Sequence, residues 1–371
     1  NFLTPPCVAS DMKRLVVALV LLSRSSAFEG REALFARSSG ALVEEFPKLR
    51  SDAWAQNIRT LPKSKMLRRV GSHLTFTGAW TALVIAGNDA MPGMLPSVDP
   101  QPVTIVSTCL TILLGFRTSQ SYDRFWDGRN SWSEVWASCR ALTRVGGAYY
   151  DDLTEAEEEP GSSSSSSFNA ALALVATYPY ALLYHLRNQT AENAATLHDL
   201  YLEFADDVGG VPDAPANALH LKELATRGEH VPIALLDALS LEFRDLRPPD
   251  APEYPVSNLE AHLDRLGRAL CSAERIVMTP VPPSYTRHTS RVTTLWSLAL
   301  PFCFDQVERP AIVLASVLLV SWALYTLEEI GKVIEEPFGS DAEDLALDLP
   351  LDKYALSIAT DVLRSRRRRL V

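Results

Sequence analysis

Residues Thr104–Arg140 read TIVSTCLTILLGFRTSQSYDRFWDGRNSWSEVWASCR, and this stretch joins an apolar segment directly to a charged one. The apolar segment, Val103–Phe116, begins one residue before this stretch, has interspersed Thr and Ser and contains no charged side chain. Arg117 follows at once, and further charged residues come after it. A bilayer requires a helix of about 20 residues. The pattern therefore predicts one long helix that crosses a membrane and continues beyond it.

One stripe of this helix has two interpretations. Thr108, Ile112 and Phe116 are spaced i, i+4, i+8, so they share a helix face. From the residues alone, helix packing is the preferred interpretation. The alternative is a pore lining, because narrow apolar rings block ions by dewetting and phenyl edges carry partial positive charge that favours anions. Helix N-termini that point at a lumen would add positive potential.

Two further apolar regions support a membrane protein. The first is Leu74–Gly87, and the second begins near Val292, pauses around 301–310 and resumes as Ile312–Leu327. None is a clean run of 20, and the last would cover about 24 Å at 1.5 Å per residue. Aromatic residues near the block ends, where interfacial side chains belong, are Trp296, Trp322 and Tyr325. The alternative is a soluble protein with buried core helices.

The remaining periodic segments are all helical in pattern. The predicted helices are 168–186, 190–205, 214–225, 233–244 and 259–276, the last with an apolar stripe at Leu259, Leu263, Leu266, Leu270 and Val277. No strand pattern stands out. The predicted fold class is all-α, a helical transmembrane bundle with a helical extramembrane domain.

Composition narrows the function classes. The chain has 371 residues and a formal net charge of −10, which argues against a nucleic-acid binder. Five scattered cysteines without a C-x-x-C pair predict neither a disulfide framework nor a zinc site. Seven scattered histidines, with no H-E-x-x-H, G-x-S-x-G or phosphate-binding Gly loop, argue against an enzyme. The basic run 366–369 is interpreted as a solvated tail rather than a lipid or protein contact.

The N-terminus has the pattern of a targeting signal. Met12 is the expected start of the natural protein, and Lys13-Arg14, an apolar run from 15 to 22 and the small residues 25–27 have the order of a signal peptide. The junction Ala27-Phe28 resembles bipartite plastid signals, although the acidic residues after it depart from a transit peptide. Plastid targeting, plain secretion and a chance pattern remain alternatives.

Four blocks of the sequence resemble the bestrophin family of anion channels. They occur in family order: GFRTSQSYDRFWDGRNSW (115–132), LVATYPYAL (174–182), PVPPSYTRHTSR (280–291) and EEIGKVIEEPFGSDAEDLALD (328–348). The resemblance covers most of residues 66–350 and is closer to the bacterial and plastid branch than to the animal one. It changes the preferred interpretation of the stripe from packing to pore lining.

The resemblance implies a homopentamer around one pore. It places the pore neck at Thr108, Ile112 and Phe116, where Thr108 departs from the family's usual apolar residue, and a second constriction, the aperture, at Val281. Four charged residues near the neck either tune the vestibule or form structural ion pairs, with pairing to Asp123 and Asp127 preferred. They are Arg117, Asp123, Arg124 and Arg129.

The resemblance also raises the question of calcium. Asp341 and Asp344 fall on positions of the calcium clasp of animal members, but Ala342 interrupts the acidic run. Plant-type relatives generally lack calcium activation. No cofactor is therefore expected to be required, with calcium at these two carboxylates as the alternative.

These implications divide the chain into segments. They are 1–65, a targeting region and flexible lead-in; 66–150, the first transmembrane helices and long pore helix; 151–167, a disordered acidic and Ser-rich loop; 168–280, the extramembrane domain; 281–335, the aperture and last transmembrane helices; and 336–371, the tail.

The expected function is an anion-selective channel that passes chloride across a plastid thylakoid or envelope membrane and supports charge balance. Alternatives are a bicarbonate channel that serves carbon concentration and a non-conducting membrane scaffold. Another endomembrane or the plasma membrane is the alternative location. The expected partners are further copies of the chain, small anions and membrane lipid, without nucleic acid.

Overall fold

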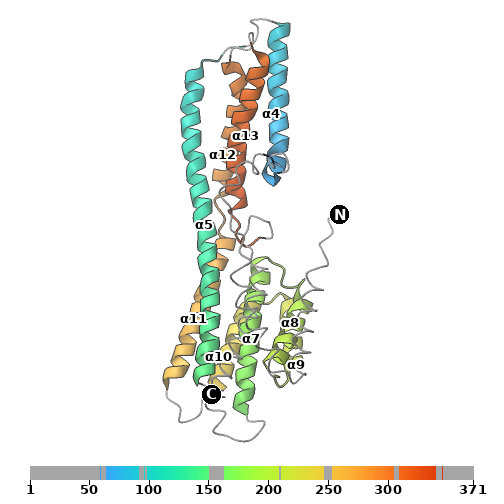
Figure 1. Ribbon diagram of the computed structural model, residues 1–371, viewed down its shortest axis with the longest axis vertical. Coiled ribbons are helices and arrows are strands. Elements are labelled where there is room, and N and C mark those ends of the chain that lie inside the picture. The colour runs from blue at the N-terminus through green and yellow to red at the C-terminus, as the bar shows by residue number, and fades with distance from the viewer. Residues whose placement is uncertain are drawn as a thin grey trace. The chain divides into compact units, whose positions relative to one another are not determined.

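Every regular element in the described part of the chain is a helix, which confirms the all-α expectation (Figure 1). The computed structural model describes residues 59, 64–91, 96, 98–149, 163–208, 210–245, 253–304, 309–339 and 345. Its elements are α4 (Lys65–Ala90), α5 (Pro100–Tyr149), α7 (Ser163–Leu186), α8 (Ala194–Asp207), α9 (Ala214–Arg227), α10 (Val231–Asp245), α11 (Glu253–Met278), α12 (Pro283–Ala299), the 3₁₀ helix η2 (Leu300–Cys303) and α13 (Pro310–Val333).

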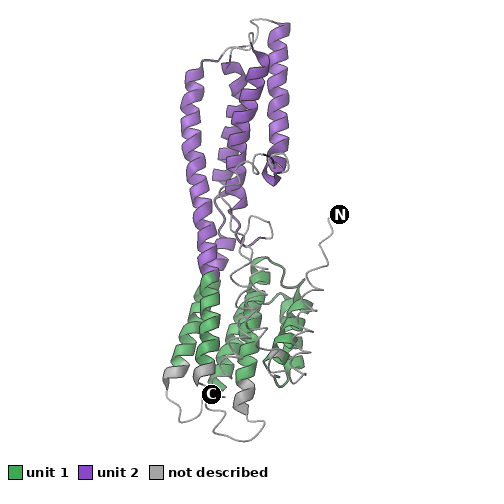
Figure 2. Cartoon of the chain, viewed as in Figure 1, with its two compact units in different colours: residues 1–48, 133–271, 347–371 green, residues 49–132, 272–346 purple. Residues whose placement is uncertain are grey.

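The chain divides into two compact units (Figure 2). One comprises residues 49–132 and 272–346 and is called the spanning unit. The described residues of the other lie within 133–271 and are called the helical domain. The division falls inside α5 and α11, whereas the sequence-based boundaries were placed at 150 and 280.

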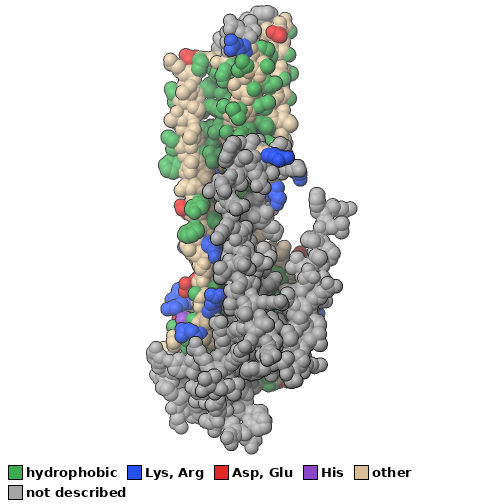
Figure 3. Space-filling view, in the orientation of Figure 1, with side chains coloured by type: hydrophobic (Ala, Val, Ile, Leu, Met, Phe, Trp, Pro, Cys, Tyr) green, Lys and Arg blue, Asp and Glu red, His purple; other side chains and the backbone are tan. Residues whose placement is uncertain are grey.

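Two described helices are long and apolar enough to cross a membrane. They are α5 and α13, and only 17% and 22% of their most apolar windows are buried within the chain. The core helix of a soluble protein would be mostly buried. Hydrophobic side chains gather over α4, α5 and α13 (Figure 3). The exposed apolar surface of these helices therefore favours lipid or other subunits as their surroundings.

The core of the spanning unit joins α5, α12, η2 and α13. Its buried members are Leu110, Leu114, Trp296, Leu300, Val313 and Val317. Helix α4 packs closely on α13, because a Cβ added to Gly78 would lie 3.2 Å from Leu318. The hydroxyls of Thr77 and Tyr325 share a hydrogen bond of 3.0 Å between the same two helices.

Two of the predicted interfacial aromatics are packed against other helices of the spanning unit. Trp296 is buried, and its Nε1 donates to the carbonyl oxygen of Val103 at 3.0 Å. Tyr325 is buried as well. Helix partners therefore satisfy the polar atoms of both rings.

Hydroxyl groups in the spanning helices bond to their own backbone. Among the residues that donate to the carbonyl oxygen four positions earlier are Thr81, Thr104, Thr108, Thr111, Thr118, Thr289, Thr293 and Thr294. Such bonds satisfy the hydroxyl donor without water, as the interior of a bilayer requires.

The helical domain is built around α7. This helix is buried on nearly all sides from Phe168 to Leu183 and packs against α8 and α10, while α8 packs against α9. Gly146 allows the end of α5 to approach α7, since a Cβ there would lie 2.6 Å from the ring of Phe168. The predicted helices are thus confirmed.

Two sequence-based details differ from the structure. Helix α7 begins at Ser163, inside the Ser-rich segment, so the expected loop 151–167 is at least five residues too long. On α11, Leu259, Leu263, Leu266 and Leu270 are buried as expected, but Val277 is exposed and Ile276 is buried in its place. The targeting region before residue 59, loop residues 151–162 and the tail beyond 345 lie outside the described residues.

Candidate functional site

The predicted neck residues lie on the open face of α5. Ile112 and Phe116 are 55% and 64% exposed, and Thr108 is exposed too. On the opposite face, Leu110 and Leu114 are buried in the core. Helix α5 therefore has one packed face and one apolar face that the described part of the chain leaves open, which is suited to a lumen, lipid or another subunit.

Ile105 extends this open stripe, and the sequence-based prediction did not include it. It is 67% exposed and lies three residues before Thr108 and seven before Ile112, on the same helix face. Its i, i+3, i+7 spacing was the signal that could have found it.

Thr108 is less polar than its residue type suggests. Its Oγ1 donates to the carbonyl oxygen of Thr104 at 3.2 Å. The hydroxyl proton is thereby directed into the helix, and the side chain offers its methyl group and acceptor lone pairs to the open face. The stripe thus carries one weakly polar level beside the fully apolar Ile112 and Phe116.

The predicted aperture residue lies in a short proline-rich connection. Val281 is half-buried and stands between the end of α11 and the start of α12. Its backbone N–H donates to Oε1 of Glu335 at 3.1 Å. Pro283 opens α12, a position where the missing N–H of proline costs nothing.

Arg124 holds the C-terminal end of α11. Its Nη2 and Nη1 donate to the carbonyl oxygens of Ile276 and Thr279 at 2.6 and 2.5 Å, and its Nε donates to the carbonyl oxygen of Glu335 at 3.3 Å. The last carbonyls of a helix have no intrahelical donor, so a cation that binds them caps the helix and complements its dipole. Arg124 thereby ties α5 to the segment that leads into Val281.

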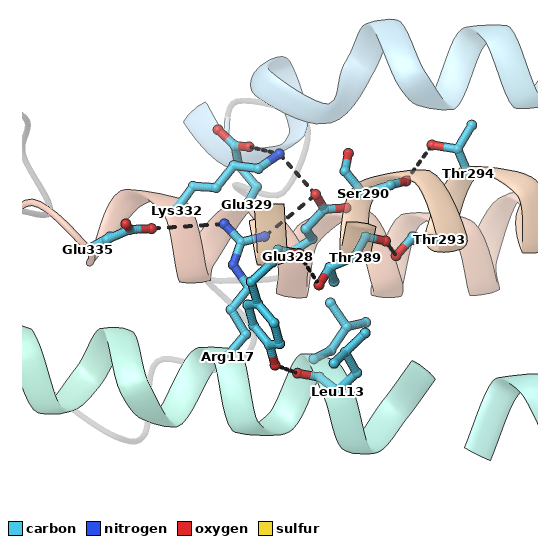
Figure 4. Close-up of polar contacts among 12 residues, drawn as sticks. Leu113, Arg117, Thr289, Ser290, Thr293, Thr294, Glu328, Glu329, Lys332 and Glu335 are labelled. Atoms are coloured by element: carbon cyan, nitrogen blue, oxygen red, sulfur yellow. Dashed lines mark hydrogen bonds and ion pairs between the residues drawn. The ribbon is translucent and has the colours of Figure 1, made fainter. Parts of the chain in front are cut away.

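Arg117 forms a buried charge cluster with the end of α13 (Figure 4). The side chain is only 1% exposed, and its Nη1 and Nη2 lie 3.7 Å from Glu328 and 3.9 Å from Glu335. Nζ of Lys332 lies 3.1 Å from Glu328 and 3.7 Å from Glu329. The two distances at Arg117 exceed hydrogen-bond length, so these contacts are charge pairs in a poorly solvated site.

Helix α12 is also tied to α5. The hydroxyl of Tyr285 donates to the carbonyl oxygen of Leu113 at 3.0 Å. Leu113 lies between Ile112 and Phe116 of the stripe. Arg124 and Tyr285 therefore join α5 to the segments on either side of the Val281 connection, and Arg117 reaches Val281 through Glu335.

The preferred pairing with Asp123 and Asp127 is wrong for two of the arginines. Arg117 pairs with Glu328 and Glu335, and Arg124 binds backbone carbonyls. For Arg117 the physical reason is helical geometry, because Asp123, six positions along the helix, points to a different side. Arg124 is within reach of Asp127, three positions away, but its three nitrogens donate to backbone carbonyls instead. Asp123 is exposed, and Arg129 is half-buried. Asp341 and Asp344, the alternative calcium ligands, lie outside the described residues.

The sequence-based prediction missed Glu328, Glu335 and Tyr285 as partners of the neck helix. A signal was present for Glu328, which directly follows the apolar run Ile312–Leu327. An ionisable residue at the end of an apolar span requires a partner, and the cationic residue after the other apolar run, Arg117, was the natural candidate. The positions of Glu335 and Tyr285 depend on the three-dimensional packing alone.

The fold and this site define an all-α membrane protein whose long helix α5 carries an open apolar stripe. Residues 47–360 match the family described as Bacterial/Fungal Bestrophin protein, and the chain belongs to the bestrophin family. This membership confirms the prediction that the chain is not an enzyme.

Curated relatives carry the names of channels. The chain is 30% identical over 254 residues to a voltage-dependent anion channel-forming protein of Nostoc sp., covering 67% of this chain and 74% of that protein. It is 29% identical over 281 residues to voltage-dependent chloride channel 1, chloroplastic, of Arabidopsis thaliana, covering 75% of this chain and 62% of that protein.

A solved structure has the same fold. The crystal structure of a bacterial bestrophin homolog from Klebsiella pneumoniae, obtained by Zn-SAD phasing, has a TM-score of 0.64 and 21% sequence identity, covering 80% of this chain and 98% of that chain. This likeness confirms the bestrophin-like helical fold.

Proposed function

We propose that this chain is the subunit of an anion-selective channel in which five copies surround one pore. Helix α5 lines the neck with Thr108, Ile112 and Phe116, and Val281 lines the aperture. The observation that carries the proposal is the open apolar stripe on α5, opposite a face packed in the core. The names of the cyanobacterial and plant relatives support the choice of anions.

The anion preference arises without a ring of cationic side chains. Arg117 is 1% exposed and engaged with two glutamates, and Arg124 is engaged with three carbonyls, so neither is available to bind a permeant ion. Instead, the edges of the Phe116 rings present partial positive charge to the lumen. The apolar width of the neck controls hydration and therefore conduction.

The proposed permeant ion is chloride and the proposed location is a plastid thylakoid or envelope membrane. The location is supported by the targeting pattern at the N-terminus and by chloroplastic relatives such as the Arabidopsis channel. No cofactor is required in this proposal. A calcium requirement through Asp341 and Asp344 is the alternative, which conduction in the presence of a chelator would exclude.

Planar-bilayer recording of the purified protein tests the function. Reversal potentials in gradients of chloride, bicarbonate and a monovalent cation are expected to show anion selectivity with chloride permeant. A larger permeability for bicarbonate would instead support the bicarbonate alternative. Native mass spectrometry of the same preparation is expected to show five copies.

The result that contradicts the proposal is a silent bilayer from protein that native mass spectrometry shows to be an intact pentamer, with or without calcium. That outcome would support the membrane scaffold.

A further inference from the structure

One carboxylate contacts both segments to which the constrictions are assigned. Oε1 of Glu335 accepts the backbone N–H of Val281 at 3.1 Å, and Oε2 lies 3.9 Å from Nη2 of Arg117. Arg117 directly follows Phe116 in α5. The two oxygens of a single side chain therefore reach the aperture connection on one side and the neck helix on the other.

The hydrogen bond between Val281 and Glu335 uses the only backbone N–H group in the connection formed by residues 280–283. Residues 280–283 read Pro-Val-Pro-Pro, and proline has no backbone N–H. The Val281 N–H is therefore the single amide donor of the four residues, and Glu335 accepts it. Displacement of the Glu335 side chain leaves this connection without that anchor.

The backbone of Glu335 is held at the same place as its side chain. Its carbonyl oxygen accepts a hydrogen bond from Nε of Arg124. Glu335 lies two residues beyond the last residue of α13. Arg124 and Tyr285 also tie α5 to neighbouring segments, but their bonds go to backbone carbonyls and not to Val281. Among the described residues, Glu335 is the side chain that joins the Val281 amide to α5.

We infer that Glu335 is a positioning residue that couples the aperture to the neck. A shift of α5 that moves Arg117 displaces the carboxylate, and the carboxylate displaces the Val281 backbone. The two constrictions then change together rather than independently. This inference rests on the proposed function, because it assumes that Phe116 and Val281 line one pore.

A double-mutant cycle measures this coupling. Open probability and conductance are recorded for Phe116→Ala, Val281→Ala and the double variant, first in the native background and then with Glu335→Gln. Glutamine keeps an oxygen for the Val281 N–H but removes the charge that faces Arg117. In the native background, the combined effect is expected to depart about fivefold from the product of the single effects. With Glu335→Gln, the departure is expected to fall within about twofold.

The neighbouring carboxylate provides the matched control. Glu336 is exposed, and among the described residues its side chain forms no hydrogen bond or ion pair with α5 or Val281, so Glu336→Gln is expected to preserve the fivefold departure. A purely structural role of Glu335 would change stability and leave the departure intact. Where Glu335→Gln does not assemble, Glu335→Asp replaces it, since the shorter acid retains its charge but cannot reach both partners.

The outcomes separate the inference from the proposed function. A conducting native protein in which the cycle keeps its departure in the Glu335 variant that assembles overturns the coupling alone. The coupling is also overturned if, in the native background, the effect of the double variant equals the product of the Phe116→Ala and Val281→Ala effects. A native pentamer that passes no anion overturns the proposed function and the coupling together.

Discussion

The guanidinium of Arg117 lies 3.7 Å from the carboxylate of Glu328, and both side chains are almost completely buried. A buried pair of this kind contributes little compared with an apolar pair of the same shape, because desolvation offsets the attraction. Removing one partner is different, since the other charge then remains buried without compensation. The stability of the spanning unit is therefore sensitive to the replacement of either residue alone.

Arg117→Met is expected to lower the free energy of unfolding by about 3 kcal/mol, the low end of the range for a broken buried pair, because Lys332 still compensates Glu328. Thermal unfolding of the solubilised protein measures the change. Arg117→Met combined with Glu328→Gln is expected to recover part of it. The control is Arg227→Met, which breaks an exposed pair and should cost about 0.5 kcal/mol or less. An equal effect of the two single variants would show that the Arg117 cluster is solvated.

Phe116→Ala is expected to raise single-channel conductance about threefold without preventing assembly. The ring is exposed, so its loss leaves no cavity in the core, while the neck becomes wider and easier to hydrate. Val106→Ala is the control, since Val106 is exposed on α5 but about a third of a turn away from the stripe. An equal change in conductance for Phe116→Ala and Val106→Ala would show that Phe116 does not line the neck.

Thr108→Val is expected to lower conductance about twofold, because a methyl group replaces the oxygen whose lone pairs keep this level of the neck wet. Thr108→Ser retains the oxygen and should conduct like the native protein. Thr111→Val removes a hydroxyl with the same backbone bond on another side of α5 and serves as the control. A drop with Thr111→Val but not with Thr108→Val would place a different face of α5 at the lumen.

Gly128→Ala is expected to destabilise the spanning unit by about 1–3 kcal/mol. An added Cβ would lie 2.8 Å from Cγ of Pro337, and a proline ring cannot rotate away. Gly267→Ala is the matched control, because a Cβ there meets nothing within 4 Å and alanine favours the helix by about 1 kcal/mol. Chemical denaturation in detergent should therefore show opposite signs for the two substitutions. The same sign for both would mean that Pro337 yields to the methyl group.

The close approach of Gly128 to Pro337 shows what the sequence could and could not predict. Helix positions followed from apolar periodicity, which is local, and the match of α13 to the run Ile312–Leu327 is an example. The contacts between the block around Gly128 and the block around Pro337 join residues far apart in the chain. The order of these blocks along the sequence indicated a family, but it did not predict which of their residues are in contact.

The neck and its charges illustrate the same limit at the candidate site. The spacing of Thr108, Ile112 and Phe116 placed them on one face, because a helix has a fixed period. The partners of Arg117 and Arg124 could not be found in this way, since they belong to α11, α13 and the segment that follows α13. Local reasoning therefore favoured nearby aspartates over distant glutamates and carbonyls.

His262 predicts a pH dependence of the helical domain. Burial lowers the pKa of this histidine from its ordinary value of 6.5, and the charges of Arg265 and Arg144 lower it further against the opposing charge of Glu134. Nη1 of Arg265 lies 3.4 Å from Nδ1, where it donates to the neutral ring. The folded state therefore binds a proton less readily than the unfolded state.

The contribution of His262 to stability is then complete above pH 6.5 and is lost as the pH falls through the lowered pKa of the folded protein. The melting temperature of native protein should decrease from pH 7.5 to pH 5 more steeply than that of His262→Gln, which cannot titrate. His220→Gln serves as the control, because His220 is exposed, and it should follow the native curve. Protonation of a buried imidazole beside two arginines destabilises the fold around it, so native protein should lose more stability in acid than His262→Gln. Parallel losses in the two proteins would show that the acid sensitivity arises from other groups.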